Sequence, residues 1–302
     1  MPASISKIDF LVPQKKNYLK KKKLFKKIYD KTGIEETFRA PSNEDVIDLA
    51  VKLCKKNKKF IKDCDGIIFV TQTPRYLLPS CSCILQEKLA FSNNIMTFDI
   101  NMGCSGFVHS LSVAKSLIEN NTLKKILLIC GDTYNSYFYK NNKNEYLFSD
   151  AVSLAIIKKT KSFGIKNFLF GSDGSGYDKI IIKKNLEKKL EFEMSGAEVF
   201  AFTLNTIPKL VKNFLKKNSL DINNFQGIIF HQASRVILEN LKEKLALGDN
   251  FIIDLKYGNT TSSTIPITIK RALDKKILKK GDQILICGFG VGLAWGIGTL
   301  KI

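Results

Sequence analysis

Cys104 stands at a point where a strand pattern gives way to a helix pattern. Residues 95–100 are apolar and β-prone, and beyond Ser105 apolar residues recur at helical spacing: Phe107, Val108, Leu111, Ala114, Leu117 and Ile118. Gly103 and Gly106 permit a sharp turn. A cysteine at a helix N-terminus faces unpaired N–H groups and the positive end of the helix dipole, which favour the nucleophilic thiolate. The segment is equally typical of a small buried cysteine packed in a tight turn.

Two further side chains have the chemistry to work with a thiolate. The chain has 2 histidines. His109 follows Cys104 on the same predicted helix at a spacing that turns it away, so we expect a structural role. His231 ends a predicted buried strand. A lone histidine there is usually a core residue, but beside an elbow cysteine we favour a catalytic imidazole. Asn259 is either a turn residue or an amide that donates to a carbonyl as charge develops.

These side chains follow segments that recur in the same order in two halves of the chain. Three pairs of segments match at an offset of about 160 residues: 65–70 with 226–231, the elbow of Cys104 with 251–259, and 125–131 with 282–288. Each half alternates strands with helices, which predicts an α/β fold with mainly parallel sheets covered on both faces. The predicted halves are residues 1–160 and 161–302, with 159–175 as the bridge.

The duplication gives a geometric reason to gather the polar residues into one site. In α/β sheets ligands bind beyond the carboxyl ends of the strands. Cys104, His231, Asn259 and the glycine-rich segment 288–292 all follow predicted strands, and a pseudo-twofold axis would bring these ends together. In this scheme Cys104 and Asn259 occupy equivalent positions in the two halves.

The remaining segments complete the predicted architecture. We expect the lysine-rich run 15–27 to be a helix whose apolar side docks on the body. Helices are also expected at 44–60 and 80–89, a strand region at 146–158, and two strands joined by a turn at 283–300.

Composition bounds the class of protein. The chain has 302 residues and 44% hydrophobic residues, enough for a large core. We see no signal peptide at the N-terminus, and the longest uncharged stretch, 283–300, is short for a membrane span. Seven cysteines, an odd number, predict a reducing cytoplasm rather than a disulfide framework. Cys81 and Cys83 are too close together for the usual zinc spacing, so no metal is expected.

The formal net charge is +20. Such a balance suggests an acidic partner, which would be nucleic acid, an anionic membrane or an acidic carrier protein. The lysines spread over nearly every segment, which favours a general lysine bias for most of the charge. A nucleic-acid-binding module would need a recognised motif, and the sequence contains none that we identify.

The chain resembles β-ketoacyl-acyl carrier protein synthase III, within the thiolase-like condensing enzymes. The motifs that carry the resemblance span nearly the whole length: Thr32-Gly33-Ile34, Leu78-Pro79-Ser80, 99–107, 171–176, 194–200, His231-Gln232-Ala233, Gly258-Asn259-Thr260 and 288–296. The resemblance implies duplicated βαβ halves in a five-layered αβαβα sandwich. It also implies a homodimer that acts with an acidic acyl carrier protein and uses no cofactor, acyl-coenzyme A or acyl-carrier thioesters being substrates.

The resemblance further implies an acyltransferase of fatty-acid initiation or a related pathway. Cys104 would take an acyl group from a thioester, and malonyl-acyl carrier protein would then lose CO₂ and attack the acyl-enzyme. His231 and Asn259 would stabilise the enolate oxygen, and the backbone N–H groups of Cys104 and Val291 would form the oxyanion hole. The implied substrate-binding residues are Leu77, Leu78, Phe289, Gly290 and Arg235, with the two leucines lining the partner's acyl pocket.

Three alternatives remain open at this stage. The first is an acyltransferase that passes the acyl group to an amine or hydroxyl without condensation, and Asn259 argues against it. The second is a non-catalytic partner subunit, against which the intact Cys104, His231 and Asn259 argue. The third is a basic nucleic-acid-binding module, which rests on charge alone.

Overall fold

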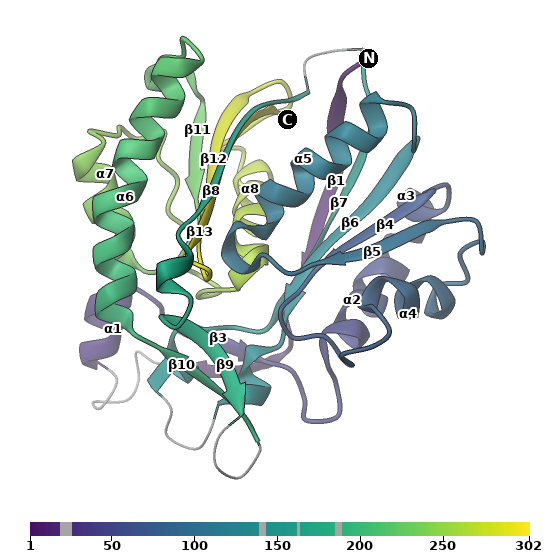
Figure 1. The fold of residues 1–302 in the computed structure, drawn as a ribbon, viewed down its shortest axis with the longest axis horizontal. Coiled ribbons are helices and arrows are strands. Elements are labelled where there is room, and N and C mark those ends of the chain that lie inside the picture. Colours follow the sequence, from purple (N-terminus) through teal and green to yellow (C-terminus); the bar gives the residue numbers. More distant parts are fainter. Residues whose placement is uncertain (19–25, 139–142, 162–163, 185–188) are drawn as a thin grey trace.

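The computed structural model describes residues 1–18, 26–138, 143–161, 164–184 and 189–302, and its framework is two sheets with helices around and between them (Figure 1). The first sheet has the strand order β1-β7-β6-β4-β5. The β1/β7 and β7/β6 pairs are antiparallel, and the β6/β4 and β4/β5 pairs are parallel. The strands are β1 (Ala3–Leu11), β7 (Ala151–Lys159), β6 (Lys125–Asp132), β4 (Gly66–Val70) and β5 (Met96–Ile100).

The second sheet repeats the plan of the first. Its order, taken from the other edge, is β8-β13-β12-β11, with two antiparallel pairs followed by a parallel one. Phe251 adds a single parallel bridge beside Ile228, in the place that β5 fills in the first sheet. The strands are β8 (Ile165–Ser172), β13 (Ala294–Lys301), β12 (Gln283–Gly290) and β11 (Gly227–Phe230). The predicted duplication is therefore confirmed, while the exact boundary at residue 160 stays a prediction.

The helices complete five layers in the predicted αβαβα order (Figure 1). Helices α5 (Gly106–Glu119) and α8 (Thr264–Asp274) lie between the two sheets and touch strands of both. Helices α2 (Val46–Lys56) and α4 (Cys81–Lys88) cover the outer face of the first sheet. Helices α6 (Gly196–Lys217) and α7 (Arg235–Lys244) cover the second.

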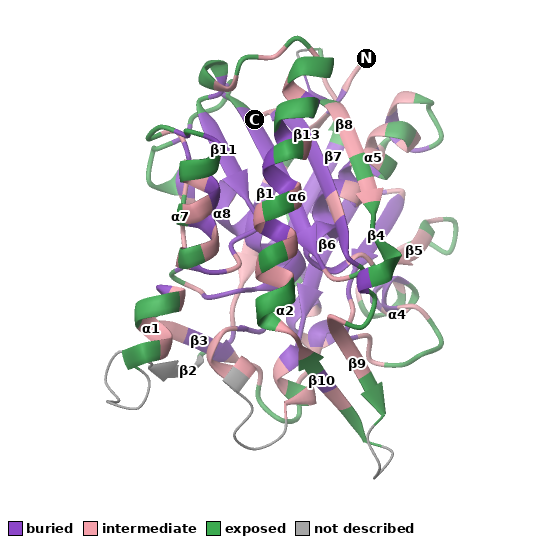
Figure 2. Ribbon diagram, turned by 60° about the vertical axis from the view of Figure 1, so that its left-hand side comes forward, coloured by how far each residue is buried: buried purple, intermediate pink, exposed green. Residues whose placement is uncertain are grey.

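Burial follows from this layering (Figure 2). One apolar cluster fills the space between the sheets, and two others lie beneath the outer helices. Because α8 is enclosed by both sheets, every residue from 264 to 269 is buried. The outer helix α2 instead buries one face and begins with a capping box between Asp45 and Asp48, which satisfies its first N–H groups.

Smaller elements lie below the main sheets in Figure 1. They are the antiparallel pairs β2 (Lys15–Tyr18) with β3 (Glu36–Arg39) and β9 (Ile180–Lys184) with β10 (Leu190–Met194), and the short helix α1 (Lys26–Thr32). The short helix α3 (Lys58–Ile61) directly follows α2, and its Ile61 packs in the same apolar cluster. Over the described ranges, no helix has the length and apolarity needed to cross a bilayer.

Several predicted elements are wrong. The run 15–27 is not one helix, because β2 pairs with a strand some twenty residues later; residues 19–25 lie outside the described part, and helix begins only at Lys26. The sheets are mixed rather than mainly parallel, since β6/β7 and β12/β13 are antiparallel neighbours. The 251–255 strand is reduced to the bridge at Phe251, and the 159–175 bridge is largely β8, an edge strand of the second sheet.

Other boundaries shift without changing the architecture. The helix expected at 44–60 divides at Asn57 into α2 and α3. The strand expected from residue 146 begins at Ala151. The helix expected at 80–89 and the two strands at 283–300 are confirmed as α4, β12 and β13.

Candidate active site

Cys104 lies in a 3₁₀ turn, Gly103–Ser105, that leads from β5 into α5. The predicted strand–elbow–helix is confirmed. Gly103 has φ +44°, a left-handed conformation that glycine adopts without strain. Strand β12 passes so close that a Cβ on Gly290 would lie 3.1 Å from Cys104 Sγ. The turn and β12 therefore hold the sulfur from two sides.

The sulfur of Cys104 has two backbone donors but is not a thiolate at rest. Burial raises the pKa of the thiol to about 12, with a further contribution from the Asp132 carboxylate, although hydrogen bonds from the N–H groups of Cys104 and Val291 act in the opposite direction. The sequence predicted that the helix terminus would favour the thiolate. Burial outweighs it in the structure, so attack on a carbonyl requires an acceptor for the thiol proton.

His231 follows β11 and is buried against the second sheet. Its backbone N–H donates to the Cys287 carbonyl at 2.8 Å, and its Nδ1 lies 2.7 Å from Thr264 Oγ1. Burial lowers its pKa to about 3, although a hydrogen bond to the Thr261 carbonyl opposes this shift. The imidazole is therefore neutral at pH 7. Because a hydroxyl can donate or accept, the Thr264 contact is compatible with either tautomer of the ring.

Asn259 precedes the second elbow and is fixed from both sides. Its backbone forms two hydrogen bonds with the first half. Its N–H donates to the Leu147 carbonyl at 3.0 Å, and its carbonyl accepts from the Ser149 N–H at 2.9 Å. Its side-chain Oδ1 accepts from the Thr261 N–H at 2.9 Å. The amide oxygen is thus engaged, which leaves the two N–H donors of Nδ2 to serve a ligand.

A cavity of about 210 Å³ brings these residues together. Cys104 comes from the first half, and His231, Asn259, Phe289, Gly290 and Val291 come from the second. Most of the other lining side chains are apolar or aromatic, including Tyr134, Leu147, Phe148, Ile180, Phe192, Met194, Val199 and Phe200. The arrangement suits an apolar chain whose reactive carbon lies at the sulfur.

Three sequence-predicted substrate residues lie elsewhere in this chain. Arg235 does not line the cavity and packs over the Tyr29 ring, 5.5 Å from its centroid. Leu77 and Leu78 are 94% and 86% exposed in the loop before α4. His109 bonds the Ser105 carbonyl through Nδ1 at 3.0 Å and packs on a phenylalanine ring. It does not line the cavity.

Sequence reasoning missed four polar residues around the site. Gln72 and Thr261 line the cavity, Thr264 contacts His231, and Asp132 binds the hydroxyl of Thr261 at 2.5 Å. Two signals were present in the sequence: the hydroxyl-rich run 260–264 after Asn259, and an aspartate at the end of a buried strand. As for metals, the residues described contain no group of three His, Cys, Asp or Glu side chains able to hold an ion.

The fold and this site together define a member of the thiolase-like class, with two duplicated halves that place a cysteine opposite a histidine and an asparagine. Two family descriptions match the chain: 3-oxoacyl-[acyl-carrier-protein (ACP)] synthase III over residues 98–174, and its C-terminal part over 215–302. The chain belongs to the 3-oxoacyl-[acyl-carrier-protein] synthase III family.

Individual relatives match along nearly the whole chain. The beta-ketoacyl-[acyl-carrier-protein] synthase III of Clostridium tetani is 33% identical, with 99% of this chain and 95% of the relative covered. That of Campylobacter jejuni is 34% identical, with 90% and 87% covered. A crystal structure of 3-oxoacyl-(acyl-carrier protein) synthase from Burkholderia xenovorans superposes with a TM-score of 0.92 at 27% identity, over 100% of this chain and 94% of that one.

Proposed function

We propose that the chain is a decarboxylating condensing enzyme that joins a Cys104-bound acyl group to the two-carbon unit of malonyl-acyl carrier protein. Family membership supports the condensing reaction. The observation that carries the residue assignment is the shared cavity, which is lined by a buried sulfur with two backbone donors, a neutral imidazole and an amide.

In the first step Cys104 Sγ attacks the carbonyl carbon of an acyl thioester. The bond from that carbon to the donor sulfur breaks, and the acyl group becomes a thioester of Cys104. Since the thiol is neutral at rest, its proton passes to Nε2 of His231 and then to the departing thiolate, which leaves as a free thiol. The N–H groups of Cys104 and Val291 stabilise the tetrahedral oxyanion.

In the second step the malonyl thioester loses CO₂, and the electron pair of the broken bond forms an enolate. The Asn259 amide donates to the enolate oxygen. His231 also donates there through Nε2, in the tautomer whose Nδ1 accepts from Thr264 Oγ1, which requires the Thr264 hydroxyl to turn from the Thr261 carbonyl to the ring. The carbanion then attacks the acyl carbonyl on Cys104. A carbon–carbon bond forms, the carbon–sulfur bond to Cys104 breaks, and the thiolate takes up a proton as the β-ketoacyl product leaves.

Intact-protein mass spectrometry tests the first step. We expect incubation with a panel of acyl-coenzyme A and acyl-carrier thioesters to add the mass of one acyl group to the protein, and Cys104→Ala to abolish the gain. Cys83, the exposed cysteine, is the control for nonspecific acylation, so Cys83→Ser should behave as the wild type. An adduct that survives in Cys104→Ala but disappears in Cys83→Ser would refute the assignment.

Addition of malonyl-acyl carrier protein tests the second step. Release of CO₂ and a β-ketoacyl product is expected from the wild type, and Asn259→Ala should acylate but condense poorly. Acyl transfer to an amine or hydroxyl without CO₂ release would favour the simple acyltransferase. If a broad panel of donors gives no adduct, the non-catalytic subunit becomes the better explanation.

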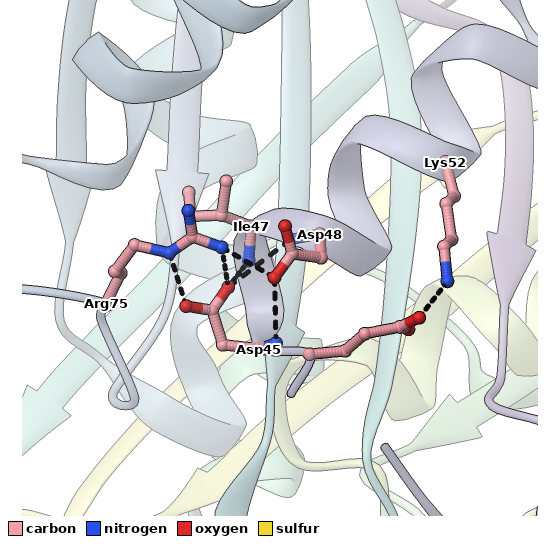
Figure 3. Close-up of polar contacts among 6 residues, drawn as sticks. Asp45, Ile47, Asp48, Lys52 and Arg75 are labelled. Atoms are coloured by element: carbon pink, nitrogen blue, oxygen red, sulfur yellow. Dashed lines mark hydrogen bonds and ion pairs between the residues drawn. The ribbon is translucent and has the colours of Figure 1, made fainter. Parts of the chain in front are cut away.

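We also propose that the chain works as a homodimer in which Leu77 and Leu78 reach the partner's acyl pocket. These leucines are largely exposed, yet the loop that carries them is firmly attached. The Arg75 guanidinium forks onto Asp45 and Asp48 at the start of α2, with Nη2 at 2.7 and 2.6 Å from their oxygens (Figure 3). A rigid loop with apolar tips fits insertion into a second copy.

Light scattering after size exclusion tests the dimer. The wild type should have twice the mass of one chain, and Leu77→Asp combined with Leu78→Asp should shift it to the monomer. Ile277→Asp, at another exposed apolar residue, is the matched control. A double variant that remains dimeric would contradict the proposed role of the loop.

The other predicted partners and conditions belong to the same proposal. The net charge of +20 fits an acidic acyl carrier protein, and its binding should weaken with salt. All seven cysteines are free thiols, which fits the predicted cytoplasm. We propose that this chemistry uses only protein groups and the thioester substrates, with no cofactor.

A further inference from the structure

Asp132 is a buried carboxylate at the junction of the two halves. It ends β6 and is 1% exposed. Five neutral donors reach its oxygens. Oδ1 accepts from the Gln72 N–H at 2.7 Å, from Thr71 Oγ1 at 3.2 Å and from Thr73 Oγ1 at 3.4 Å. Oδ2 accepts from Thr261 Oγ1 at 2.5 Å and from Ser262 Oγ at 3.2 Å. The first three belong to the first half and the last two to the second. The mechanism above assigns no step to this group.

Thr261, the closest donor to Asp132, has an unfavourable backbone conformation. Its φ is +52°, a region that β-branched residues rarely adopt because it is sterically strained. Thr261 opens the 3₁₀ turn Thr261–Ser263 before α8, as Gly103 opens the turn Gly103–Ser105 before α5. The first half uses glycine at this position. The second half uses threonine, whose hydroxyl is held by the carboxylate.

The backbone of Thr261 connects the two proposed enolate donors. Its N–H donates to Oδ1 of Asn259 at 2.9 Å. Its carbonyl accepts from Thr264 Oγ1 at 3.0 Å, and that oxygen lies 2.7 Å from Nδ1 of His231. A rotation of the Thr261 peptide groups would therefore disturb both the amide and the imidazole.

We propose that Asp132 is a positioning residue that holds Thr261 in its left-handed conformation and thereby orients Asn259 and His231 for decarboxylation. The inference rests on the proposed function for its kinetic readout. If Asp132 has this role, the rates of acylation and condensation depend on the carboxylate to different extents. Acylation needs Cys104, its backbone donors and Nε2 of His231 as proton acceptor, whereas condensation also needs Asn259 and requires both enolate donors in register.

Substitution of Thr261 separates the half-reactions. Thr261→Val keeps the shape but removes the hydroxyl, and Thr261→Ser keeps the hydroxyl. We expect Thr261→Val to lower kcat for condensation by about 100-fold, the effect of a misplacement of about 1 Å. Cys104 acylation should fall by a much smaller factor, since that step uses His231 but not Asn259. Thr261→Ser should restore condensation. Thr71→Val, which removes a donor from the other oxygen of Asp132, is the matched control and should condense as the wild type.

Asp132→Asn provides the complementary test. The amide no longer offers two acceptor oxygens, so condensation should fall as in Thr261→Val. The Asp132 charge raises the pKa of Cys104, so its removal partly offsets the displacement of His231, and acylation should fall less than condensation. A general loss of structure would slow both half-reactions, and the rate ratio separates these outcomes.

Nitrogen-15 NMR of histidine gives a readout that does not depend on activity. The chain has 2 histidines, and the ring of His109 is bonded to the Ser105 carbonyl rather than to the Thr261–Thr264 chain of hydrogen bonds. We expect Thr261→Val and Asp132→Asn to shift the ring resonances of His231 and leave those of His109 in place. The NMR measurement tests the role of Asp132 even if the wild type fails to condense. Such a failure would count against the proposed function alone.

Two outcomes would overturn the inference. One is wild-type condensation in both Thr261→Val and Asp132→Asn with unshifted His231 resonances. The other is an equal loss of acylation and condensation in both variants, which would make Asp132 a general structural residue. If Thr261→Val fails to fold, the ratio of half-reactions in Asp132→Asn decides.

Discussion

Gly290→Ala places one methyl group against the proposed nucleophile. The added Cβ would lie 3.1 Å from Cys104 Sγ and 3.0 Å from Cys104 Cβ. Carbon contacts are most favourable at about 3.5–4.0 Å, so the neighbours must separate by about half an ångström or more. Overpacking of this kind costs about 1–3 kcal/mol. Because Val291 directly follows Gly290, we expect the sulfur and one oxyanion donor to move together.

Two assays measure the consequence. Acylation of Cys104, followed by mass spectrometry, should slow by about 100-fold, since an error of about 1 Å at the reacting atoms has this effect. The midpoint of thermal unfolding should fall by about 5 °C. Gly174→Ala is the matched control, because a Cβ there meets no atom within 4 Å. A Gly290→Ala protein with wild-type acylation and midpoint would refute the close approach of β12 to the sulfur.

Three further perturbations probe other contacts. Burial lowers the pKa of His231 from 6.5 to about 3. The stability that the neutral ring contributes is therefore complete above pH 6.5 and is lost as the pH falls towards 3. Urea midpoints of the wild type should show this loss relative to His231→Gln, which cannot titrate, and parallel pH curves for the two proteins would contradict it. Arg75→Ala removes the fork onto Asp45 and Asp48 and should cost about 1–2 kcal/mol in denaturant unfolding. Arg75→Lys should recover little of it because lysine lacks the planar fork, and full recovery would show that charge alone matters. Phe192 is a buried aromatic side chain of the cavity wall, and Phe192→Leu should shift acyl-donor preference towards longer chains by about tenfold in competition mass spectrometry; an unchanged preference would place the chain end elsewhere.

The elbow of Cys104 and the duplication could be predicted because both depend on local pattern. A short apolar run, two glycines and a helical period identify the turn without knowledge of the rest of the chain. The buried strands β4, β6, β11 and β12 are continuous apolar runs, so their recurrence in order is visible in the sequence. The repeated order of these apolar runs is what reveals the two halves in the sequence.

Strand direction and the lysine-rich segment could not be predicted for the same reason. The antiparallel pairing of β6 with β7 depends on the path of the connection between them, 133–150, which carries no periodic signal. Strand β2 gains its hydrogen bonds from β3, a partner some twenty residues away, and the sequence of β2 alone resembles a helix face. In both cases a nonlocal partner decides the outcome.

The charge state of the site also lay beyond the sequence. The helix terminus beside Cys104 is visible in the pattern, but the depth of burial that raises the pKa of its thiol is not. Asp132 looked like the ordinary polar end of a strand. Its importance appears only when Thr261, from the other half, is seen on its Oδ2.

The comparison of the two elbows explains why the proposed site is asymmetric within a symmetric fold. The turns Gly103–Ser105 and Thr261–Ser263 have the same place before α5 and α8, so the counterpart of Cys104 is Ser262 and not, as the sequence suggested, Asn259. Ser262 donates to Asp132 at 3.2 Å and does not line the cavity. In the proposed mechanism one elbow presents the nucleophile, whereas the other binds a buried carboxylate and is preceded by the Asn259 amide. The proposed condensation needs one nucleophile and one set of enolate donors; the two diverged turns would supply the nucleophile and the Asn259 donor, and His231, which follows β11, would supply the other.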